Sequence, residues 1–71
     1  MEIRRAILKK FEAGSYRATI EVSGSAGGWL SAVPVARNIA AGDLLAGRQV
    51  ALLLFDSSNP DDAVIFAVWA T

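Results

Sequence analysis

The sequence predicts an all-β domain, a small five-stranded OB-like barrel with a short helix or loop between its third and fourth strands. Five short runs are either alternately apolar and polar or apolar throughout, and turns rich in glycine, serine or proline separate them. A chain of 71 residues suffices for one small core, so residues 1–71 are expected to form a single domain. An SH3-like barrel is the alternative architecture.

The first two strands are predicted to form a hairpin. Residues 3–11 alternate imperfectly, because charged side chains interrupt both faces, so an edge position or a bulge is expected. Residues 12–15 form the turn, where Gly14 can take a positive φ. The second strand has the cleanest alternation, and its predicted inward residues are Tyr16, Ala18, Ile20 and Val22.

The middle of the chain supplies a third strand and the only plausible helix. Residues 29–33 form a short strand that ends at Pro34, which cannot donate a ladder hydrogen bond. Residues 37–47 contain helix-favouring alanines and leucines, but Gly42 limits the helix to one turn or less. Gly47 suits the C-terminal cap of that turn.

The last two strands, residues 49–55 and 63–69, are apolar on both faces. Successive side chains of a strand point to opposite faces, and a domain with one core can bury only one of them. The second face is therefore expected to contact another copy of the chain or another protein. The residues assigned to this self-association interface are Ala51, Leu53, Phe55, Ile65 and Trp69.

The composition favours association and removes several kinds of chemistry. Hydrophobic residues make up 54% of the chain and the mean hydropathy is +0.39, which is high for so small a domain. The sequence has no cysteine and no histidine, so no enzymatic activity, cofactor or metal is predicted. No apolar run approaches the roughly 18 residues of a membrane helix. The N-terminus lacks the apolar region of a signal peptide.

The charges are separated along the chain although their sum is zero. Residues 1–37 carry six basic and three acidic side chains, whereas residues 38–71 carry one basic and four acidic ones. Such a dipolar subunit suits a head-to-tail contact between copies, which produces a ring or a filament rather than a two-fold dimer. The residues expected to make this electrostatic contact are Lys9, Lys10, Asp61 and Asp62.

Several short features follow one another in a recognisable order. They are an alternating run over 17–22, Gly-Gly-Trp-Leu over 27–30, Pro34, Ala-Gly-x-x-Val over 46–50, Leu54-Phe55, and Asn-Pro-x-x-Ala-Val-Ile over 59–65. This order resembles the OB-fold domain of bacteriophage baseplate assembly protein V and related contractile-tail spike proteins. The resemblance implies a structural hub or adaptor whose partners are copies of itself and other tail or baseplate proteins.

A different function remains open for a barrel of this kind. OB barrels bind single-stranded nucleic acids or oligosaccharides by stacking on aromatic side chains beside a polar or basic groove. The residues that could supply such a groove are Tyr16, Trp29, Arg17, Arg4 and Arg5. The aromatic content of 8% and the zero net charge make nucleic acid the weaker expectation.

Overall fold

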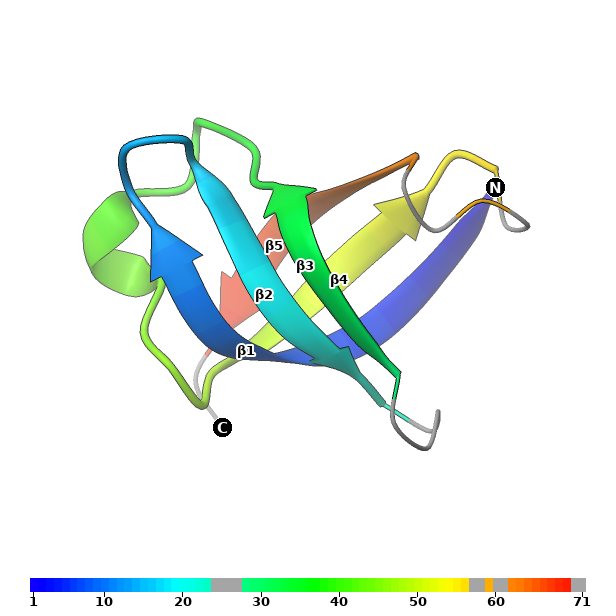
Figure 1. Cartoon of the computed structure of the whole chain (residues 1–71), viewed down its shortest axis with the longest axis horizontal. Helices are drawn as coiled ribbons and strands as arrows, with labels where there is room; N and C mark the ends of the chain where they lie inside the picture. The colour runs from blue at the N-terminus through cyan, green and yellow to red at the C-terminus, as the bar shows by residue number, and fades with distance from the viewer. Residues whose placement is uncertain (24–27, 57–58, 60–61, 70–71) are drawn as a thin grey trace.

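The fold is one five-stranded antiparallel sheet (Figure 1). The computed structural model describes residues 1–23, 28–56, 59 and 62–69. Its elements are β1 (Glu2–Glu12), β2 (Arg17–Val22), β3 (Trp29–Pro34), the 3-10 turn η1 (Ala41–Asp43), β4 (Gln49–Leu54) and β5 (Ala63–Trp69). The predictions of an all-β chain, of five strands and of a short helical turn between the third and fourth strands are confirmed.

The long strand β1 organises the sheet, whose order is β3-β2-β1-β4-β5. The second half of β1 pairs with β2, and its first half pairs with β4. Ala6 and Ile7 belong to both pairings, so the strand passes from one neighbour to the other at this point. Figure 1 shows β1 bending across the molecule, which lets one sheet wrap around a single core.

The sheet is not closed, so the predicted barrel is a wrapped sheet with a seam. The seam lies between the edge strands β3 and β5, where Val35, directly after β3, forms an isolated parallel bridge with Ile65. Beside it, the N–H of Ala36 donates to the carbonyl of Ile65 at 2.9 Å. Pro34 has no N–H to extend this pairing back along β3. Backbone pairing across the seam is therefore made by the residues that directly follow β3.

Register shifts interrupt three of the ladders. In β1 the shift lies between Leu8 and Lys10, which confirms the irregularity expected in the first strand. Another occurs where β2 pairs with β3, next to Ala32, which has a φ of 56°. The third lies between β4 and β5 and decides which side chains of β5 face inward. Each bulge adds local twist and bend to its strand, which helps a small sheet to curl.

The core is a continuous apolar cluster inside this wrapped sheet. In the described part of the chain its buried residues are Ala6, Leu8, Ala18, Ile20, Val22, Val33, Val35, Ile39, Leu44, Val50, Leu52, Leu54, Ala63 and Ile65. The inward assignment of the second strand is confirmed, because three of its four residues are buried and Tyr16 packs against the cluster. No polar or charged residue is buried among the residues that the structure describes.

The segment between β3 and β4 covers one end of the core. Ile39 and Leu44 enter the cluster, and the hydroxyl of Tyr16 donates to the carbonyl of Ile39. Gly47 has a φ of 94°, a conformation that favours glycine, and its N–H donates to the carbonyl of Leu8 at 2.8 Å. This turn therefore returns the chain to β1 just before β4 begins.

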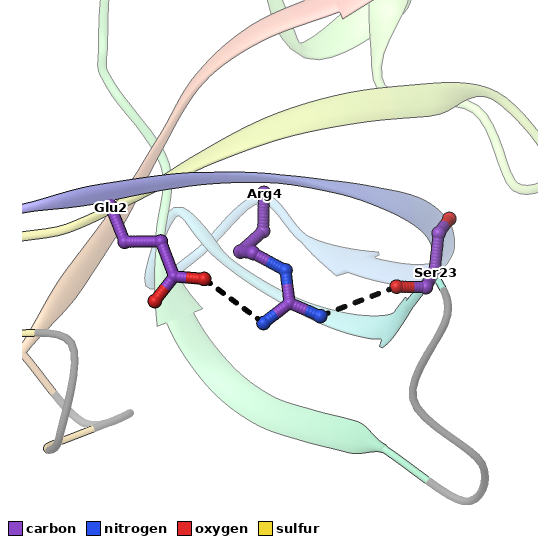
Figure 2. Close-up of polar contacts among 3 residues, drawn as sticks. All are labelled: Glu2, Arg4 and Ser23. Atoms are coloured by element: carbon purple, nitrogen blue, oxygen red, sulfur yellow. Dashed lines mark hydrogen bonds and ion pairs between the residues drawn. The ribbon is translucent and has the colours of Figure 1, made fainter.

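A polar cluster ties the start of β1 to the end of β2 (Figure 2). Arg4 donates through Nη1 to Oε2 of Glu2 at 3.2 Å and through Nη2 to the carbonyl of Ser23 at 3.4 Å. Arg4 lies on the same face of β1 as the buried Ala6. Because its side chain is about a third exposed, solvent weakens these contacts, and they fix local geometry more than they stabilise the fold.

Candidate functional site

The strongest candidate is the solvent side of β1, β4 and β5, which we call the outer face. It consists of side chains that lie opposite one another across three neighbouring strands. Its three rows are Ile3–Leu53–Val64, Arg5–Ala51–Ala67 and Ile7–Gln49–Trp69. Two of the nine positions, Arg5 and Gln49, are polar, so this face is apolar across all three strands.

Large apolar side chains on and beside this face are exposed to solvent. Ile3 is 64% exposed, Phe66 is 42% exposed and Trp69 is 39% exposed. Phe55, at the end of β4, is 51% exposed. Single exposed apolar residues are ordinary, but a contiguous group over neighbouring strands is typical of an interaction surface.

One of the five predicted interface residues, Ile65, does not lie on this face. Its side chain is completely buried in the core. The prediction assumed regular alternation along residues 63–69, but Leu52 pairs with Ile65 while Ala51 pairs with Ala67. Phe66 is therefore an extra residue that reverses the alternation between the two halves of β5. The assignment of Ile65 to the outer face is wrong.

Three of the other predicted residues are on the outer side of the sheet, and Phe55, which directly follows β4, is exposed. Ala51 and Leu53 are half-buried members of the rows, and Trp69 is exposed at one corner. The large apolar residues that sequence reasoning missed on and beside this surface include Ile3, Val64 and Phe66. The alternation of the first strand could have indicated Ile3, whereas Phe66 depends on a bulge that alternation does not reveal.

Gln49 brings an amide group into the outer face between two apolar side chains. Its neighbours in the row are Ile7 on β1 and Trp69 on β5. The Oε1 atom of Gln49 is buried and has no hydrogen-bond partner among the described residues. A buried acceptor without a donor costs roughly 1–3 kcal/mol. This position is therefore unfavourable in an isolated copy.

The predicted electrostatic residues lie apart from this face and differ in their surroundings. Lys9 pairs with Glu21 at 3.1 Å, and its Nζ lies 5.5 Å from the centre of the Trp29 ring. Lys10 is exposed and makes no ion pair within the described part of the chain. Asp62 is exposed next to β5, and Asp61 lies outside the described residues. Lys10 and Asp62 are thus the members best placed to meet another copy.

A second surface lies along the open edge of β3. A cleft of about 410 Å³ follows this strand and reaches Ala63, with Trp29 and Arg17 in its lining. Trp29 is 55% exposed, and Arg17 donates to the carbonyl of Ala32 at 2.9 Å. A smaller hollow of about 170 Å³ adjoins it and contains Lys10. The cleft therefore combines one exposed aromatic ring with a nearby cation.

Two further kinds of site are absent from the described residues. Carboxylates do not gather there into a group of three or more that could hold a metal ion. None of the described helices has the length and the apolar character needed to cross a membrane.

Comparison with family models, with curated proteins and with solved structures gives no match for this chain. Its class is therefore defined by its own geometry. It is a small all-β domain, built as one wrapped antiparallel sheet, with an exposed apolar face on three strands.

Proposed function

We propose that the protein is a non-enzymatic structural subunit that assembles with copies of itself through the outer face of β1, β4 and β5. The observation that carries the proposal is the continuity of apolar side chains across these three strands. The core on the other side of the sheet already uses the inward residues of β4 and β5, so among the described residues the outer side chains are not part of the core.

The energy available from this surface is large for so small a domain. Full burial of a large apolar side chain contributes about 1.5–3 kcal/mol, and a half-exposed side chain gains about half of that. Ile3, Phe66 and Trp69 are each between 39% and 64% exposed. Two copies would cover six such side chains, which gives roughly 4–9 kcal/mol towards association before the entropic cost of docking.

The resemblance to phage baseplate domains points in the same direction, because it implies a role in assembly rather than in chemistry. A ring or a filament, with tail or baseplate proteins as further partners, is the form of assembly that this resemblance favours. The absence of histidine and cysteine from the sequence agrees with a non-enzymatic role.

The mass of the particle in solution tests the proposal. We expect light scattering to give a multiple of 7.5 kDa for the natural chain at micromolar concentration. Leu53→Lys places a charge at the centre of one apolar row and should yield a folded monomer. Ser31→Lys adds the same charge on the exposed cleft side and should leave the mass unchanged. A natural chain that stays monomeric at high micromolar concentration would refute self-association.

The cleft along β3 supports a second candidate, a module that binds single-stranded nucleic acid or an oligosaccharide. The specific observation is Trp29, which is 55% exposed at a cleft that Arg17 also lines. Bases and sugar rings both stack on exposed aromatic side chains. Titration with oligo-dT and with a neutral hexasaccharide, for the natural chain and for Trp29→Ala, distinguishes the two ligands. Unchanged tryptophan fluorescence with both at low salt would exclude this candidate.

A further inference from the structure

The residues of the outer face are arranged in three rows centred on β4, and this arrangement bears on how two copies meet. Leu53, Ala51 and Gln49 lie along the middle strand. Each is flanked by one residue of β1 and one of β5. The central row has two alanines, whereas bulky side chains occupy the rows on either side. Within β4 and β5, the central row therefore has smaller side chains than the rows beside it.

Two sheets can pack face to face around a two-fold axis in either of two simple orientations. An axis perpendicular to β4 through Ala51 would place Arg5 of one copy against Arg5 of the other. Apposition of like charges in an interface is costly. An axis parallel to β4 instead places Arg5 opposite the partner's Ala67, at the edge of the contact where water can reach the guanidinium group. The charge of Arg5 therefore favours the axis parallel to β4.

The same axis addresses the unpaired acceptor of Gln49. With the axis parallel to β4, each outward residue of that strand faces the same residue of the partner copy. Gln49 of one copy therefore meets Gln49 of the other. A primary amide carries both donors and acceptors, and two of them related by a two-fold axis can each donate to the other. Such a pair would supply a donor to Oε1, which has no partner among the described residues.

We infer that the outer face is a two-fold interface between two copies of this chain, in which the Leu53 side chains pack together and the Gln49 amides pair across an axis parallel to β4. This inference rests on the proposed function and specifies its geometry. Facing sheets pack about 10 Å apart with their strands nearly aligned.

The size of the molecule is compatible with this interface. A standard interface covers about 800 Å² of each partner. The accessible surface of the chain is 4194 Å², so such a contact would use roughly a fifth of it. Three of the five strands contribute to the outer face.

Site-directed cross-linking tests the axis, and the absence of cysteine from the sequence makes each introduced thiol unique. A short bismaleimide is the suitable reagent, because strands about 10 Å apart exceed the reach of a disulfide. Ala51→Cys lies on the axis and should cross-link to itself. The Arg5→Cys variant and the Ala67→Cys variant should each cross-link poorly when present alone. When the two variants are mixed, cross-linking between them should be several-fold more efficient. Ser31→Cys, on the cleft side, gives the background from random collisions.

The outcomes separate this inference from the proposed function. If light scattering shows an assembly but Arg5→Cys cross-links efficiently to itself, the axis is perpendicular to β4 and the inference is wrong. If the assembly forms but Ala51→Cys reacts no faster than Ser31→Cys, the contact uses another surface and the inference is also wrong. If the natural chain is monomeric, the proposed self-association is wrong, and the inference about its axis falls with it.

Discussion

Ala51 lies opposite Ala67 in the ladder between β4 and β5, one residue further along β5 than regular pairing would give. The preceding pair on β5 is Leu52 with Ile65, so Phe66 is left without an opposite residue. This single insertion lets Ile65 fill the core while Trp69, at the other end of the same strand, remains on the outer face. The bulge thus determines both the core and the candidate interface.

A pair of alanine substitutions tests whether Ile65 belongs to the core and Phe66 to the outer side of β5. Ile65→Ala removes a completely buried side chain and should lower the free energy of unfolding by about 2–5 kcal/mol. Phe66→Ala removes a side chain that is 42% exposed, so it should cost the isolated domain much less. Its main effect should be weaker association. Urea denaturation, performed in the Leu53→Lys background to exclude assembly, measures the difference. Equal losses for both variants would contradict the position of the bulge.

The amide of Gln49 gives a prediction about association. Gln49→Leu has a similar size and removes the buried acceptor that lacks a partner, so the isolated domain should become as stable or more stable. In the dimer the same change removes the proposed amide pair but adds apolar contact. We therefore expect the variant to associate at least as strongly but with less uniform geometry. Cross-linking of Ala51→Cys in this background should be less selective relative to Ser31→Cys.

The hydroxyl of Tyr16 makes a testable contribution to the fold. It donates to the carbonyl of Ile39 and so fastens the segment before η1 to the core. Tyr16→Phe should lower the free energy of unfolding by about 0.5–1.5 kcal/mol. The N–H of Ile39, which donates to the carbonyl of Ala36, should also exchange its hydrogen faster. Unchanged stability and exchange would show that this bond does not hold the segment.

Two glycines near η1 form a matched pair. Gly47 has a φ of 94°, and Gly47→Ala should cost about 1–2 kcal/mol because alanine resists this conformation. A Cβ atom on Gly42 would meet nothing within 4 Å, and its φ lies outside the positive region. Gly42→Ala should therefore be neutral or stabilise by about 0.4–1 kcal/mol. Thermal denaturation of both variants compares them, and a similar loss in each would point to side-chain packing instead.

Sequence reasoning predicted the features that depend on local pattern. The regular alternation through Ile20 and Val22 identified core positions, and Gly42 correctly limited the helix to a short turn. The position of Ile65 could not be predicted, because a bulge depends on how a strand fits its neighbour rather than on its own residues. The open seam is a second example, since the extent of pairing between Val35 and β5 depends on tertiary packing.

The predicted ring or filament requires a contact in addition to the two-fold interface. A two-fold contact alone stops at a dimer, whereas a second, head-to-tail contact links dimers into larger assemblies. Lys10 and Asp62 are both exposed, so they are the described residues suited to this role. Lys9 is less suitable, because Lys9→Glu would place a new carboxylate beside Glu21 in the same copy.

A charge reversal tests the head-to-tail contact. Lys10→Glu should remove species larger than the dimer in light scattering, since it opposes the carboxylate of Asp62 in the next copy. In the double variant that combines Lys10→Glu with Asp62→Lys, every copy carries both reversals, so attraction and the larger species should return. High salt should weaken assembly of the natural chain, because exposed charges are screened over about 8–10 Å. Ala41→Glu, at another exposed position, is the control for added negative charge. Larger species that resist both salt and Lys10→Glu would exclude these charges from the contact.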